Sequence, residues 1–166
     1  MYQSKLFLSL EKRFFDYLLI ICFSFFACTS FFTSSFIALN LPLTPESKNF
    51  LIRGLYWYGQ NIDPALIKNP LSLQIQSFID VFIFGPFYLL LVYAFIKGKN
   101  WIRVPAIIYV SAITYSMILY LGIEFMGDYP PNNYLVFLAI NLPYLLIPLA
   151  LGYRMRKTYP FSKKSI

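Results

Sequence analysis

Four long runs of apolar residues, separated by polar or proline-rich stretches, dominate the pattern of this chain. They extend over about residues 14–39, 73–96, 104–125 and 134–151. Each is close to the roughly 20 residues that an α-helix needs to cross the hydrocarbon core of a bilayer. The pattern therefore predicts an all-α membrane protein whose four transmembrane helices form a bundle.

Three prolines interrupt these spans, namely Pro86 in the second and Pro143 and Pro148 in the fourth. A proline inside a helix removes a backbone donor and bends the helix. We therefore predict proline-bent helices around an intramembrane pocket. Because the spans are rich in tyrosine, its wall should be aromatic and mostly apolar, which suits a sterol or a hydrophobic amine better than an ion or a sugar.

Residues 40–72 make the longest segment between spans. Within it, the run NFLIRGLYWYGQ has apolar residues at helical spacing and includes Trp57, which predicts a short helix at the membrane interface. Asp63 and Pro64 follow, a pair typical of a turn or a helix start, where Asp63 would cap a short helix. We expect Trp57, Asp63 and Pro64 to have structural roles.

Charge is scarce and unevenly placed. Charged residues make up 13% of the chain, against about 25% in soluble domains. Eleven of the 14 lysines and arginines lie before the first span, in the loop at 97–103 or after Leu151. By the positive-inside rule, both termini are predicted to be cytosolic, with residues 152–166 as a basic cytosolic tail. Because the basic residues flank membrane spans, the net charge of +7 does not indicate nucleic-acid binding.

Histidine is absent from the sequence. Its absence excludes histidine-based zinc sites and Ser-His or Cys-His catalysis. The two cysteines lie six residues apart in one apolar run, which is typical of buried thiols. We expect no metal site and no cofactor.

One acidic residue, Asp80, lies clearly within a span. A carboxyl group at that depth is costly unless it faces a cavity or a partner, so Asp80 is a candidate functional residue. The small polar residues of the first span favour close packing against a neighbouring helix. The alternative is that Thr33, Ser34 or Ser35 offers its hydroxyl to Asp80.

Several stretches carry a resemblance to a known family. They are YAFIKGKNWIRVPAIIY at 93–109, NLPYLLIPLAL at 141–151, LYWYGQNIDPAL at 55–66, and Asp80 before Pro86. From about Leu55 onward the chain resembles the transmembrane protein 97 or sigma-2 receptor family, part of the EXPERA group that contains emopamil-binding protein. The resemblance implies a single domain over residues 1–166, often dimeric, with a pocket that opens sideways into the lipid. Such proteins handle sterols and bind cationic amphiphilic drugs.

The resemblance also implies which residues line the pocket. The positions that match are Asp80, Tyr109, Ser116, Asn141 and Tyr144, together with Phe36, near which the family has a second acid. No acid stands near Phe36 in this chain. Two facing carboxyls can share a proton and keep one charge for an ammonium group, whereas a lone carboxyl in an apolar site is expected to be a neutral donor. We therefore expect weaker amine binding than is typical of the family.

Two functions follow from this pattern. The favoured one is a non-catalytic intramembrane binder of sterols or other amphipathic molecules that takes part in lipid handling. The alternative is a sterol double-bond isomerase, which needs an acid and a base. The available candidates are Asp80 and Glu124, and Glu124 is expected to face water at the end of a span.

Partners and location complete the expectations. The expected partners are a sterol or lipid-like molecule, membrane lipids, a second copy of the chain and other membrane proteins. The last four residues, Lys163-Lys164-Ser165-Ile166, have the form of an endoplasmic-reticulum retrieval signal. They predict that membrane in a eukaryote, whereas a bacterial protein would lie in the plasma membrane.

Overall fold

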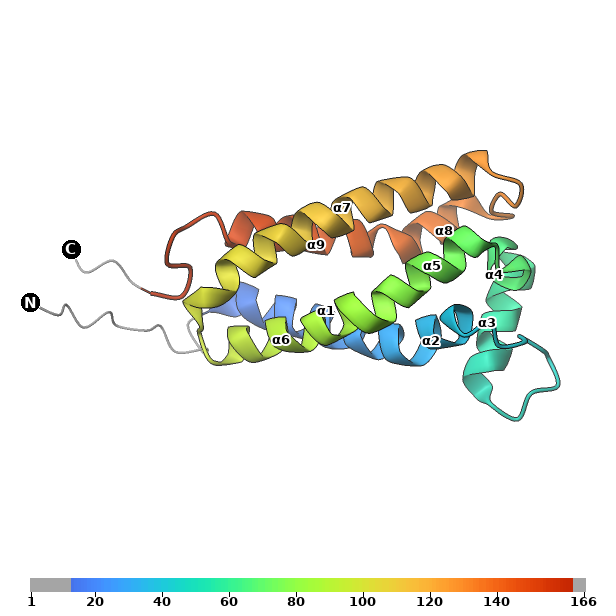
Figure 1. The fold of residues 1–166 in the computed structure, drawn as a ribbon, viewed down its shortest axis with the longest axis horizontal. Coiled ribbons are helices and arrows are strands. Elements are labelled where there is room, and N and C mark those ends of the chain that lie inside the picture. Colours follow the sequence, from blue (N-terminus) through green and yellow to red (C-terminus); the bar gives the residue numbers. More distant parts are fainter. Residues whose placement is uncertain (1–12, 163–166) are drawn as a thin grey trace, which may run out of the picture.

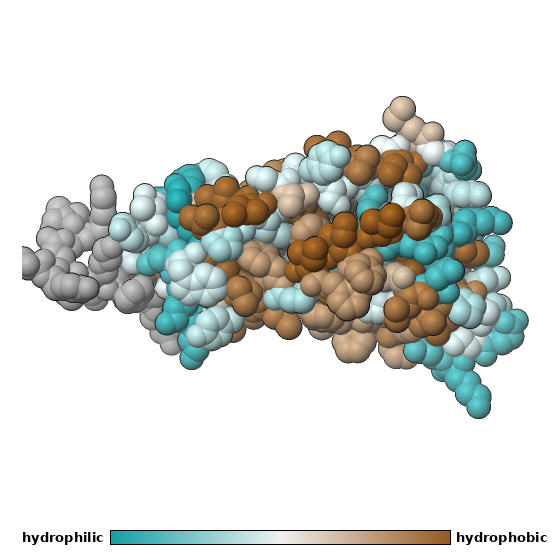
Figure 2. Space-filling model, viewed as in Figure 1, coloured by the Kyte–Doolittle hydropathy of each residue, from teal (hydrophilic) through white to brown (hydrophobic). Residues whose placement is uncertain are grey.

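Four long helices form the bundle in the computed structural model, which describes residues 13–162 (Figure 1). The helices long and apolar enough to cross a membrane are Phe14–Ala38, Leu71–Ile96, Asn100–Met126 and Tyr134–Arg154. Figure 2 shows brown apolar side chains over the middle of the bundle and hydrophilic side chains toward both ends. The predicted all-α membrane fold is confirmed, and each span begins and ends within a few residues of its predicted bounds.

Each span consists of more than one helical element. The first span contains α1 (Phe14–Thr29), the π-helical turn η2 (Ser30–Ser34) and α2 (Ser35–Ala38). The second contains α5 (Leu71–Ile79), the π-helical turn η3 (Asp80–Phe84) and α6 (Gly85–Ile96). The third contains the 3₁₀ turn η4 (Asn100–Ile102) and α7 (Arg103–Met126), and the fourth contains α8 (Tyr134–Asn141) and α9 (Pro143–Arg154).

The two π-helical turns pack against each other. Pro86 follows η3 and has no N–H to continue the ordinary hydrogen-bond ladder. The N–H of Gly85 bonds to the carbonyl of Asp80, five residues earlier, and Ser30 Oγ donates to the same carbonyl at 2.9 Å. A Cβ added at Gly85 would lie 2.7 Å from Ser30 Oγ. The first two spans therefore approach closely here because position 85 has no side chain.

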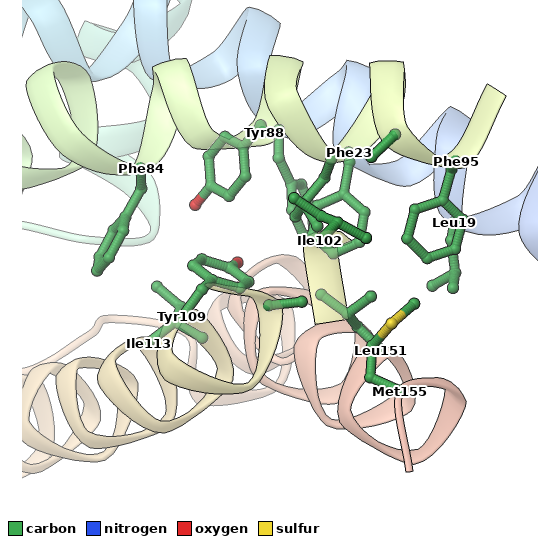
Figure 3. Packing of buried hydrophobic residues seen from close by; sticks show 14 of the residues in the cluster. Leu19, Phe23, Phe84, Tyr88, Phe95, Ile102, Tyr109, Ile113, Leu151 and Met155 are labelled. Atoms are coloured by element: carbon green, nitrogen blue, oxygen red, sulfur yellow. The ribbon is translucent and has the colours of Figure 1, made fainter. Parts of the chain in front are cut away.

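The bundle is built from two packed pairs of helices. α1 packs extensively along α6, and α7 packs along α9. The two pairs meet in an aromatic core around Phe23, Tyr88 and Tyr109 (Figure 3). The Phe23 and Tyr88 rings are stacked, with their centroids 6.0 Å apart, and Tyr109 meets both rings edge-on. This core separates one end of the bundle from the other.

A buried ionic cluster fastens the end at which the described chain begins and finishes. The Asp16 side chain is 1% exposed and accepts hydrogen bonds from Arg13 Nη1 at 2.9 Å and Arg154 Nε at 2.7 Å. The Phe161 ring is 5.1 Å from each of the two guanidinium groups. The segment after α9 therefore packs onto the bundle as far as Phe161.

Both described chain ends lie at this end of the molecule (Figure 1), as expected for termini on one side of a membrane. That this side is cytosolic stays a prediction. Lys163 and Lys164 lie outside the described residues.

At the opposite end, α3 (Phe50–Asn61) and α4 (Ala65–Lys68) form a cap over the bundle (Figure 1). The helix predicted around Trp57 is present, and Trp57 is 61% exposed on its outer side. The cap is attached on two sides. Asn69 Nδ2 donates to the carbonyl of Ile37 at 3.0 Å, and the Asn132 N–H donates to the carbonyl of Ile62 at 2.8 Å.

Candidate functional site: a cavity beside Asp80

A cavity of about 240 Å³ lies between the two helix pairs, on the cap side of the aromatic core. All four spans contribute to its wall, and Tyr58 reaches it from α3 in the cap. The cavity thus lies between the helices of the four spans. This is the kind of intramembrane pocket that the prolines and tyrosines of the sequence predict.

The Asp80 carboxyl group lies in the cavity wall, at the start of η3. Ser34 Oγ donates a hydrogen bond to Asp80 Oδ2 at 2.8 Å, and Tyr88 Oη donates to Asp80 Oδ1 at 3.2 Å. The hypothesis that a hydroxyl of the first span meets Asp80 is confirmed for Ser34. Each carboxyl oxygen therefore has a hydroxyl partner from the protein itself.

Further polar groups line the same cavity. Tyr144 Oη donates to Thr29 Oγ1 at 2.9 Å, and the Tyr144 ring stacks on Phe26 with 4.2 Å between centroids. Asn141 Nδ2 is 3.4 Å from Tyr58 Oη and 2.9 Å from the carbonyl of Phe137. The wall thus combines aromatic faces with hydroxyl and amide groups, which can bind both parts of an amphipathic molecule.

The structure brings four of the six predicted pocket residues into this wall. They are Asp80, Ser116, Asn141 and Tyr144. Tyr109 is not part of this wall but packs against Tyr88, with 5.8 Å between the ring centroids (Figure 3). That any of the six binds a ligand stays a prediction.

Phe36 lies outside the wall, whereas Ser34 is part of it. A π-helical turn takes more residues per turn than an α-helix. The turn η2 therefore changes which side chains of the first span face the second, and the resemblance that placed Phe36 in the pocket does not allow for this change. The hydroxyl of Ser34 is what Asp80 meets from the first span.

Sequence reasoning missed Gln76 and Thr29 as cavity residues. Gln76 precedes Asp80 by four residues, and this spacing places two side chains on one face of a helix. That signal could have identified Gln76. Tyr88, one of the span tyrosines expected to form the aromatic wall, does line the cavity.

Glu124 is buried, so the expectation that it faces water was wrong. Its side chain is 3% exposed because the cap folds over this end of α7 and places Asp63, which is 1% exposed, beside it. Burial raises the pKa of the Asp63 carboxyl, and hydrogen bonds from Glu124, Tyr120 and nearby backbone N–H groups oppose the rise. Burial, reinforced by the charge of Asp63, also raises the pKa of Tyr58.

Comparison with known proteins places this arrangement in a family. The EXPERA family (EXPanded EBP superfamily) matches residues 50–155, which include the cap and the last three spans. The chain belongs to the EXPERA family. The first span, with Ser34 and Asp16, lies before the matched residues of this EXPERA protein.

Three relatives of this EXPERA protein are sigma intracellular receptors 2. The protein of Xenopus tropicalis is 31% identical over 107 residues, which are 57% of this chain and 62% of the relative. The chain therefore spans less than two thirds of that relative. The proteins of Macaca fascicularis and Homo sapiens are 29% and 28% identical over 158 residues, 80% of this chain and 90% of each relative. The resemblance is confirmed, and the chain is an integral multi-pass membrane protein.

Proposed function

We propose that this EXPERA protein is an intramembrane binder of sterols or similar amphipathic molecules, of the sigma-2 receptor kind, that takes part in lipid handling. The main support is a cavity between the spans, in which one carboxyl group and several hydroxyl groups lie beside aromatic side chains. A sterol hydroxyl would bond near Asp80 and Ser34, while the ring system would contact Phe84 and Tyr144. The name shared by the relatives, a receptor, supports a binding role.

The placement of the acids favours binding over double-bond isomerisation. An isomerase needs a proton donor and a proton acceptor that both reach the substrate. Asp80 lines the cavity, whereas Glu124 faces Asp63 and is outside the cavity wall. The two candidate catalytic carboxyls therefore do not face one substrate position.

Lipid extraction tests this proposal directly. The purified protein in nanodiscs that contain a sterol should retain that sterol above the level of empty nanodiscs. Mass spectrometry and chromatography of the extract should show the sterol unchanged. Recovery at the empty-nanodisc level would overturn the binding function, and a shifted ring double bond would establish the isomerase instead.

Asp80→Asn should weaken sterol binding about tenfold. The amide retains the size of the side chain but replaces one of the two carboxyl oxygens of Asp80. Loss of one hydrogen bond between the sterol and this side chain costs about 1.5 kcal/mol. Competition against a photoreactive sterol probe measures the change. Asp128→Asn, which alters an exposed acid outside the cavity, should leave binding unchanged. Equal affinity of the two variants would contradict the role of Asp80.

Basic sigma-type ligands should bind this chain more weakly than they bind a sigma intracellular receptor 2 assayed beside it. Ser34 and Tyr88 donate to Asp80, where a second acid would have supplied a shared proton and a fixed charge. Radioligand saturation measures the dissociation constant. Nanomolar affinity that is abolished by Asp80→Asn would contradict this prediction.

The finer expectations on assembly and location stay predictions. They are a homodimer, partner membrane proteins and, from Lys163 and Lys164, the endoplasmic-reticulum membrane of a eukaryote.

A further inference from the structure

A second buried acidic site lies outside the cavity wall, where the cap meets α7. Asp63 comes from the loop between α3 and α4, and Glu124 comes from the last turns of α7. Their carboxyl groups are within hydrogen-bonding reach of each other. Asp63 Oδ1 and Glu124 Oε2 are buried and accept no well-aligned hydrogen bond from an N–H or O–H group of the described residues. A hydrogen bond between the two carboxyl groups needs a proton carried by one of them, because an ionised carboxylate has no hydrogen to donate.

Among the described residues, hydroxyl groups and backbone N–H groups surround this pair, and no basic side chain bonds to it. Tyr120 Oη on α7 donates to Asp63 Oδ2 at 3.4 Å, and Tyr58 on α3 also faces the two acids. From α8, Asn141 bonds to the Tyr58 hydroxyl. Within residues 13–162, Asp16 is the acid in both salt bridges, and neither Asp63 nor Glu124 forms one. Two ionised carboxylates would thus repel each other with no basic side chain to balance them.

We infer that Asp63 and Glu124 form a proton-binding site, and that the shared proton latches the cap over the cavity. Tyr58 connects the two features, because it belongs to the cap, lines the cavity and bonds to Asn141. On its other side the cap is held by the bond from Asn69 to Ile37. Loss of the proton would therefore weaken the α7 and α8 edge of the cap, leaving it held by the bonds that Asn132 makes to Ile62 and Gln60. The Asn69 side would remain attached as a hinge.

The sign of the pH dependence follows from proton linkage. A solvated aspartate or glutamate loses its proton near pH 4. Burial raises the pKa of Asp63 in the closed form. At a pH between the pKa of the solvated acid and the raised pKa in the closed form, the closed cap binds one proton more than the open cap. The latch is therefore strongest at low pH and weakens as the pH rises. The opening constant should increase about tenfold per pH unit until the closed pair itself ionises.

Hydrogen–deuterium exchange of the full chain in nanodiscs tests the latch between pH 5 and 8. Protection of peptides from residues 50–68 is the exchange rate of an unstructured peptide at the same pH divided by the measured exchange rate. In the wild type, protection should fall about tenfold per pH unit before it levels off. Glu124→Gln should abolish this slope, because an amide N–H donates to Asp63 without a titrating proton. The control Asp128→Asn, an exposed acid just beyond α7, should keep the wild-type slope.

Asp63→Asn provides a second variant with the same expectation, and it decides the matter if Glu124→Gln folds poorly. Protection of residues 50–68 that is independent of pH in the wild type would overturn the inference. A wild-type slope that persists in both variants would overturn it as well, because another group would then carry the proton. The measurement needs no ligand, so its outcome is separate from the test of sterol binding.

Discussion

Asp16→Asn should destabilise this protein by about 3–5 kcal/mol, the cost of leaving a buried charge without its partner. Asp16 is almost fully buried and accepts hydrogen bonds from two guanidinium groups, those of Arg13 and Arg154. The amide has the size of the carboxyl but no charge, so two neighbouring cations would face each other without an anion. Because Phe161 packs on both guanidinium groups, its contact with the bundle would loosen too.

Equilibrium unfolding in detergent micelles, followed by circular dichroism, measures this loss. Asp128→Asn makes the same chemical change at an exposed position and should leave the midpoint unchanged, since surface substitutions cost little. If Asp16→Asn unfolds at the wild-type midpoint, the ionic cluster does not fasten the first and fourth spans as described.

The second large effect concerns the contact between the two π-helical turns. Gly85→Leu should destabilise the protein by about 3 kcal/mol, the upper part of the range for overpacking. A Cβ at this position would lie 2.7 Å from Ser30 Oγ and 3.1 Å from the Phe31 ring. The two spans would have to separate, and the bond from Ser30 to the Asp80 carbonyl would be lost.

A matched control exists on the third span. Gly122 is also a helical glycine in a span, but an added Cβ there meets no atom within 4 Å. Gly122→Leu should be neutral or stabilising by up to about 1 kcal/mol, because leucine favours a helix more than glycine does. The same unfolding assay compares the two. Equal midpoints for the Gly85 and Gly122 variants would contradict the close approach at Gly85.

The spans could be predicted from the sequence because the bilayer imposes both their length and their apolar composition. The helix around Trp57 could be predicted as well, because apolar residues recur at helical spacing before a turn marked by Asp63 and Pro64. The π-helical turns could not, since the same residues are compatible with an ordinary α-helix. Their effect on register explains why Ser34, and not Phe36, faces the cavity.

Pairings between distant residues were also beyond the reach of the sequence. Asp16 and Arg154 are 138 residues apart, and Asp63 and Glu124 belong to different elements. Each acid has an ordinary local explanation, as a residue at the edge of a span, in a turn or near a helix end. Only the contact of the Asp63 loop with α7 and the packing of α9 on α1 remove these side chains from water and give them partners.

The two ends of the bundle are held with unequal strength. At the Asp16 end, charged groups bond at 2.7–3.0 Å and are packed around an aromatic ring. At the cap, the bonds to the rest of the described bundle involve no basic side chain and span 2.8–3.4 Å. Such bonds are weaker than bonds between opposite charges, and local opening begins where the contacts are weakest. Heat or denaturant should therefore detach the cap while the other end still holds. The first step of unfolding and the entry of a molecule into the cavity then start at the same place.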